Sequence, residues 1–75
     1  MIDKNKYLLA KANGLADRFR GDIISRRIAK EYPMSAQIAI LMDAETKPEQ
    51  KAEYQAFREK VKAEVDAEIA EIEGG

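Results

Sequence analysis

Cysteine and histidine are absent from this chain of 75 residues, and its aliphatic hydroxyl groups are limited to two serines and one threonine. Without cysteine no disulfide forms, and without cysteine and histidine no zinc site of the usual sulfur and nitrogen ligands exists. A nucleophile activated by a neighbouring histidine is excluded in the same way, and no glycine-rich phosphate loop is present. We therefore expect a protein that is not an enzyme and requires no metal or cofactor.

Long hydrophobic runs and flexible linkers are absent as well. The apolar stretch nearest the start of the chain covers only residues 7–10, which is too short for a signal-peptide core and far too short to cross a bilayer. No repeat, low-complexity tract or Gly/Ser linker divides the sequence. The sequence therefore predicts one domain over residues 1–75, in the cytoplasm and without a membrane partner.

The clearest helical pattern lies in the last third of the chain. Thr46 is a suitable N-cap, and Pro48 falls in the first turn, where its missing N–H does no harm. Apolar side chains then recur at intervals of three or four residues, the helical period, at Tyr54, Phe57, Val61, Val65, Ile69 and Ile72. This pattern predicts a long helix over residues 47–72.

A second helical pattern precedes the first proline. Ile24, Ile28 and Tyr32 are spaced by four residues and form one apolar stripe. The residue before Pro33 is biased away from the helical conformation, so the helix should end one or two residues before that proline. The pattern predicts a helix over residues 15–31.

The most apolar segment lies between the two prolines, at residues 35–43. Ile38, Leu41 and Met42 share one side of a short helix, and Ile40 points elsewhere. A helix that is apolar nearly all round should be the most buried one. The sequence thus predicts an all-α domain of three helices, with a short buried central helix and a long C-terminal helix. On this interpretation, Leu41→Asp should unfold the domain.

Residues 1–13 are ambiguous in pattern. They fit a helical turn that ends at Asn13 and Gly14, or a strand that runs into a turn at the same place. A lone strand needs a partner, and the sequence contains no second strand pattern. We therefore favour helix or irregular structure for this segment.

Charge is distributed unevenly along the chain. Residues 1–42 carry eight Lys or Arg and four Asp or Glu, whereas residues 43–75 carry five and ten. Helices that face each other head to tail would produce this asymmetry, and we favour that explanation. A basic surface for nucleic acid with an acidic tail is the alternative.

A nucleic-acid surface would consist of the basic side chains of the predicted helix at residues 15–31. Asp22 and Glu31 stand four residues from two of these basic residues and neutralise part of the charge. No aromatic residues interleave with the arginines as a single-strand binder requires, which disfavours nucleic acid as the partner. The candidate residues are Arg18, Arg20, Arg26, Arg27 and Lys30.

The apolar stripe of the C-terminal helix is a candidate protein interface. Upstream helices totalling some forty residues would cover only its first turns, so Ile69 and Ile72 should remain in water and invite a second copy. We expect a homo-oligomer in which the acidic half of one chain lies beside the basic half of another. The predicted interface comprises Phe57, Val61, Val65, Ile69 and Ile72.

Residues 23–65 resemble a pattern in small bacteriophage proteins that are encoded among tail genes, often near tail fibres. In that pattern a short helix ends at a tyrosine, an apolar "QIAIL" segment follows, and a helix beginning "KPE" carries two aromatic residues. The matching residues here are Tyr32, Gln37 to Leu41, Lys47 to Glu49, Tyr54 and Phe57. Pro33 directly after the tyrosine, and the segment before residue 23, depart from the pattern.

The resemblance implies a non-enzymatic phage accessory protein that acts by protein–protein interaction in tail structure or assembly. It would act in the host cytoplasm or as part of the virion, with a tail component as its partner. The leading alternative is a small phage inhibitor that binds a host defence or regulatory protein. A nucleic-acid-binding regulator that uses the basic half of the chain is the second alternative.

Overall fold

The last part of the chain forms one uninterrupted helix, α4 (Pro48–Gly74), in the computed structural model, which describes residues 1–74. Pro48 occupies the first helical position, where a missing N–H costs no hydrogen bond. The helix predicted over residues 47–72 is confirmed. The N-cap role of Thr46 is wrong, because its hydroxyl donates to the Asp43 carbonyl (3.1 Å) and closes the preceding turn.

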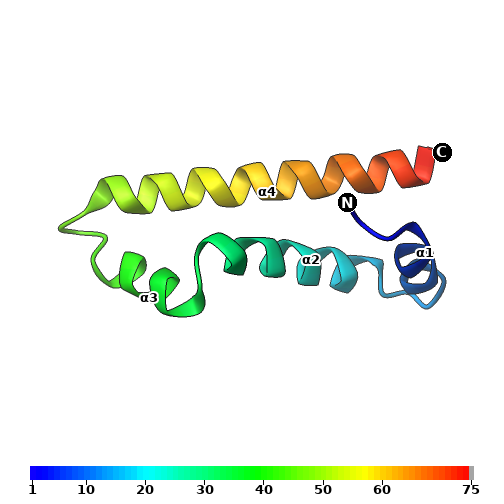
Figure 1. Cartoon of the computed structure of the whole chain (residues 1–75), viewed down its shortest axis with the longest axis horizontal. Helices are drawn as coiled ribbons and strands as arrows, with labels where there is room; N and C mark the ends of the chain where they lie inside the picture. Colours follow the sequence, from blue (N-terminus) through cyan, green and yellow to red (C-terminus); the bar gives the residue numbers. More distant parts are fainter. Residues whose placement is uncertain (75) are drawn as a thin grey trace.

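Two shorter helices, α2 (Ala16–Glu31) and α3 (Met34–Met42), lie along α4 and run in the opposite direction (Figure 1). The break between them falls at Pro33, and Tyr32 before it has left the helical region (φ −128°, ψ 87°). The boundaries of both helices match the predicted ranges to within one residue. The resulting helical hairpin is elongated, with extents of 45 × 19 × 17 Å.

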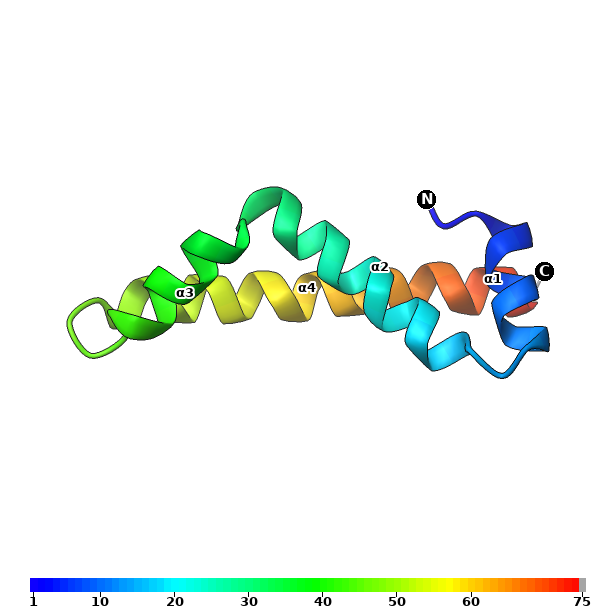
Figure 2. The same cartoon turned by 90° about the horizontal axis from the view of Figure 1, so that it is seen from below.

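A fourth helix, α1 (Lys4–Ala12), lies across the C-terminal end of α4 (Figure 2). Asp3 caps its start by accepting a hydrogen bond from the Lys6 N–H (3.1 Å). Gly14 then adopts φ +71°, a left-handed conformation that favours glycine, and the chain turns into α2. The all-α class is confirmed, but residues 1–74 contain four helices where three were predicted, and the strand alternative for residues 1–13 is wrong.

The core lies between α4 and the helices that cover one of its sides. Val65 at the centre of α4 is fully buried (0% exposed). Ile24 and Ile28 of α2 pack against the same cluster, which confirms their predicted stripe. The buried residues are Ile2, Tyr7, Ile24, Ile28, Tyr54, Val61, Val65 and Ile72.

The end of the α4 stripe is covered within the same chain, so the expectation that Ile69 and Ile72 remain in water is wrong. Ile72 is only 8% exposed and joins a cluster with Ile2 and Tyr7, while Ile69 packs partly buried against it. The error arose because residues 1–13 were not expected to supply a covering helix. The predicted homo-oligomer interface at residues 57–72 loses its physical basis, since this seam has an intramolecular partner.

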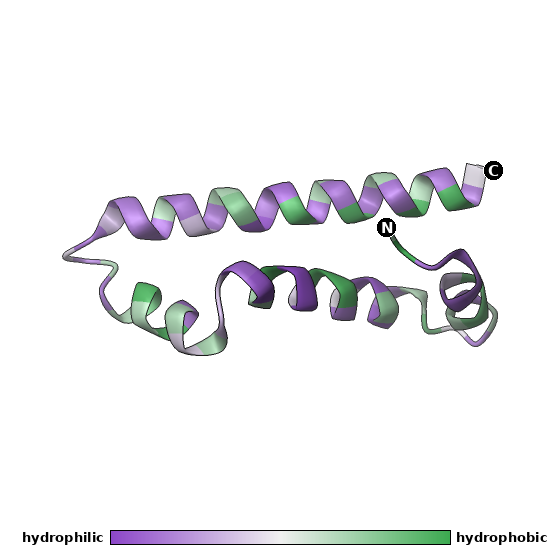
Figure 3. Cartoon of the chain, in the orientation of Figure 1, coloured by the Kyte–Doolittle hydropathy of each residue, from purple (hydrophilic) through white to green (hydrophobic). Residues whose placement is uncertain are grey.

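The expectation that the central helix is the most buried one is also wrong. None of the residues of α3 is buried, and large apolar side chains on it are exposed: Met34 67%, Ile38 50%, Leu41 56% and Met42 79%. Figure 3 shows α3 mostly in green and white, whereas α2 and α4 alternate between green and purple. Only Ala36, Gln37 and Ile40 of α3 reach partly buried positions, because α4 covers one side of α3 and nothing within residues 1–74 covers the other.

Candidate protein-binding surface

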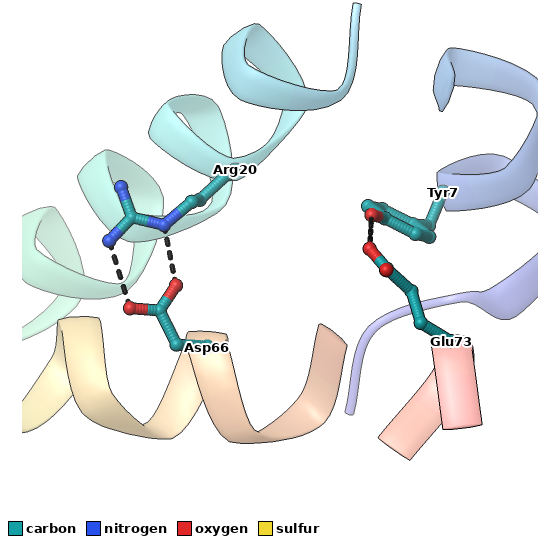
Figure 4. A network of polar contacts seen from close by, with 4 residues as sticks. All are labelled: Tyr7, Arg20, Asp66 and Glu73. Carbon is teal, nitrogen blue, oxygen red and sulfur yellow. Dashed lines mark hydrogen bonds and ion pairs between the residues drawn. The ribbon is translucent and has the colours of Figure 1, made fainter. Parts of the chain in front are cut away.

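Ion pairs join the basic helices α1 and α2 to the acidic half of α4. Arg20 of α2 donates two hydrogen bonds to the Asp66 carboxylate, one of them 3.0 Å long (Figure 4). Lys11 of α1 lies 3.4 Å from Glu73 near the end of α4. The uneven distribution of charge in the sequence is thus explained in part by helices that face each other within one chain.

Glu68 is the best-connected carboxylate of this set. Arg27 donates two hydrogen bonds to it, with Nη2 at 2.8 Å, and the backbone N–H of Ile2 donates a third at 2.9 Å. These donors lower the pKa of Glu68 from 4.5 to about 2, chiefly through Arg27, although partial burial opposes the shift. Glu68 therefore connects α2 and the segment before α1 to the same turn of α4.

A similar contact lies at the end of the hairpin. The Tyr7 hydroxyl donates a hydrogen bond to Glu73, as Figure 4 shows. This bond raises the pKa of Tyr7 and, together with Lys11, lowers the pKa of Glu73. Tyr7 also meets Phe19 edge-on at 5.9 Å between ring centroids, so α1 is held to both α2 and α4.

Stability is expected to fall as the pH drops from roughly 5 to roughly 2. The unfolded chain protonates Glu68 near 4.5 and the folded chain only near 2, so protons favour the unfolded state across this window. The pKa values of Asp66 and Glu73 are lowered in the same direction. After a discount for solvent screening, Glu68 alone contributes on the order of 1–2 kcal/mol near neutral pH.

Urea unfolding of the parent chain and of Glu68→Gln, measured across this pH range, checks the expectation. The variant should be less stable at neutral pH and should lose less stability on acidification. Parallel pH profiles for the two proteins would show that Glu68 does not contribute in this way.

The predicted nucleic-acid patch is divided by these contacts. Arg20 and Arg27 are bound to carboxylates of α4. Arg18, Arg26 and Lys30 form no ion pair among residues 1–74 and are exposed. Three of the five residues therefore remain available at the surface, on a helix that also carries Asp22.

Four of the eight large apolar side chains that are exposed among residues 1–74 lie on α3. Met34, Ile38, Leu41 and Met42 follow one another at helical spacing along its outer side, and all four are at least half exposed. We call these four residues the α3 patch. A surface of this kind, on a short helix without a single charged residue, is typical of a site that binds another protein.

A groove of about 550 Å³ adjoins the α3 patch, between α3, α2 and α4. Met34 and Leu41 of the patch form one wall, and Arg26 and Arg58 contribute basic groups to the lining. The guanidinium of Arg58 lies 5.7 Å from the centroid of the Tyr54 ring, within cation–π distance. The remaining lining residues are Ser25, Ile28, Ala29, Gln37 and Tyr54.

Gln37 holds α3 in place beside this groove. Its Nε2 donates to the Tyr32 carbonyl (2.7 Å), and its Oε1 accepts a hydrogen bond from the Tyr54 hydroxyl (2.6 Å). The ring of Tyr32 also packs against Tyr54 at 5.1 Å and against Phe57 at 5.3 Å between centroids. The position of α3 is therefore set by an aromatic and polar cluster at its inner side, together with Ile40, which packs partly buried against the core.

The sequence-predicted interface and the observed surface do not coincide. Of the predicted residues, Val61, Val65 and Ile72 are buried in the core, and Phe57 and Ile69 pack partly buried against it. The α3 patch was missed because its apolar character was interpreted as burial. The signal in the sequence was the large number of apolar residues on a nine-residue helix, more than a single neighbouring helix can cover.

Comparisons of the chain with protein-family models, with curated proteins and with solved structures find no match. Within residues 1–74, no helix combines the length and the apolar composition that a membrane span requires.

Proposed function

We propose that the chain is a non-enzymatic accessory protein that acts by binding protein through the α3 patch. The observation that carries the proposal is the exposure of four large apolar side chains on one uncharged helix. Exposure of this much apolar area to water is unfavourable, and its burial against another protein stabilises the complex. The α3 patch replaces residues 57–72 as the proposed interface.

The setting of this function comes from the resemblance of residues 23–65 to small phage proteins encoded among tail genes. On that basis the proposed role lies in tail structure or assembly, in the host cytoplasm or on the virion. The residues that carry the resemblance include Gln37 and Tyr54, which hydrogen-bond to each other and hold α3 beside α4. The resemblance thus covers the part of the chain that positions the α3 patch.

Purification of phage particles from cells that produce a tagged chain tests this function. We expect the parent to remain with the particles and Ile38→Asp to be lost from them, because an aspartate in the patch opposes its burial. Ala63→Asp is the matched control, since Ala63 is exposed on α4 and lies outside the α3 patch.

Loss of both variants, or retention of both, would contradict a role for the α3 patch in the particle. A chain that is absent from particles but binds a host protein through the same patch would instead identify the inhibitor of a host defence or regulatory protein.

A further inference from the structure

We infer that a second copy of this chain covers the α3 patch, with the two α3 helices packed antiparallel across a two-fold axis. This inference rests on the proposal that the α3 patch binds protein, and it specifies the partner. A two-fold interface places the same surface against itself, so that residues of one copy meet residues of the other reciprocally. The α3 patch and the groove beside it meet the requirements of such an interface in three respects.

The first respect is the neutrality of α3. Self-association brings identical charges close to each other near the axis, which is unfavourable. Residues 34–42 contain no charged side chain, so their pairing with a second copy opposes no like charges. The residues of the α3 patch also recur at helical spacing, so they can pack between the same residues of the α3 helix in the second copy.

The second respect is the charge at the two ends of α3. Arg58 follows Tyr54 by one turn of α4, and Tyr54 bonds to Gln37, so antiparallel packing places Arg58 toward the start of α3. Arg26 lines the same groove. Asp43 and Glu45 follow the other end of α3 and, like Arg26 and Arg58, form no ion pair among the described residues.

An antiparallel arrangement therefore brings the basic end of one copy to the acidic end of the other. This complementarity is produced twice, once on each side of the two-fold axis. A parallel arrangement would oppose like charges at both ends, so the charges select the antiparallel one.

The third respect is area. Four large side chains that are half or more exposed present on the order of 400–500 Å² of apolar surface per copy, below the roughly 800 Å² per partner of a standard interface. The groove beside the patch adds further surface that the α3 helix of the partner covers. We therefore expect a reversible dimer that dissociates in the micromolar range, and not a permanent one.

Sedimentation equilibrium of the full chain from about 1 to about 500 µM measures this dimer. The parent should shift from monomer to dimer across the range, and Ile38→Asp/Leu41→Asp should remain monomeric with an unchanged circular dichroism spectrum. Ala63→Asp, on the exposed side of α4, should dimerise like the parent. A parent that stays monomeric, or a double variant that still dimerises, would overturn the inference.

Charge reversal tests the antiparallel arrangement separately. Arg26→Glu/Arg58→Glu makes both ends of the patch acidic, and Asp43→Lys/Glu45→Lys makes both ends basic. Each variant alone should dimerise at least tenfold more weakly than the parent, and an equimolar mixture of the two should recover affinity as a heterodimer. A mixture that associates no better than the separate variants would contradict this arrangement.

The outcomes separate this inference from the proposed function. If the parent is monomeric and Ile38→Asp is still absent from the particles, the inference of a dimer is wrong and another protein covers the α3 patch. If Ile38→Asp changes neither self-association nor particle binding, the inference of a dimer and the proposed function are both wrong.

Discussion

Replacing Val65 with aspartate is expected to abolish the cooperative unfolding transition of the chain. Val65 is fully buried at the centre of α4, and the arginines of α2 nearest this part of α4, Arg20 and Arg27, are already paired with Asp66 and Glu68. An unpaired buried charge costs several kcal/mol, which is comparable to the roughly 5 kcal/mol of stability that so small a domain possesses. The spectrum of the variant should show little helix at room temperature.

Leu41→Asp is the matched control for this prediction. It introduces the same side chain, but Leu41 is 56% exposed, so the new carboxylate remains hydrated. We expect its free energy of unfolding to lie within about 0.5 kcal/mol of the monomeric parent. If Val65→Asp kept the stability of the parent, the core along α4 would be assigned incorrectly.

Tyr54→Ala is expected to destabilise the chain by about 3–5 kcal/mol, the usual cost of removing a large buried aromatic side chain. Tyr54 is buried, packs edge-on against Tyr32 and donates a hydrogen bond to Gln37. Its loss removes the hydrogen bond that joins α3 to α4 and one of the two ring contacts that join Tyr32 to α4. Urea unfolding followed by circular dichroism measures the change.

Tyr54→Phe separates the two parts of this effect. It keeps the ring and removes only the hydroxyl, so it should cost about 0.5–1.5 kcal/mol, the net value of one hydrogen bond. Equal losses for the two variants would mean that the ring packing contributes nothing, and would contradict the aromatic cluster as the anchor of α3.

The helices α2 and α4 were predictable from the sequence for local reasons. Their apolar residues recur at the helical period, and the prolines at positions 33 and 48 fix where one helix ends and the other begins. These signals act within a few residues and depend little on the rest of the fold. The boundaries of both helices accordingly agree with the structure.

The cover of the α4 stripe by α1 was not predictable in the same way. The segment before Gly14 is short, and its helix is stabilised by contacts far away in the sequence, such as Tyr7 with Glu73 and Ile2 with Glu68. A short isolated helix is marginal in water, so local pattern alone did not decide between helix and irregular structure. Without that helix, the end of α4 was wrongly expected to be exposed.

The error over α3 has a different cause. Apolar composition shows that burial of a helix is favourable, but it does not show whether the surface that buries it belongs to the same chain. In α3 the inner side is covered by α4, whereas Met34, Ile38, Leu41 and Met42 on the outer side are exposed. Similarly, the sequence did not distinguish Arg20 and Arg27, which are bound to α4, from the exposed Arg18 and Arg26.

The thermal unfolding of Leu41→Asp tests most directly the central claim that the outer apolar residues of α3 lie outside the core of the single chain. At a concentration where the parent is monomeric, the variant is expected to show the same helical spectrum and a midpoint within a few degrees of the parent. A variant that is unfolded under these conditions would contradict the claim, because Leu41 would then belong to the core of the single chain.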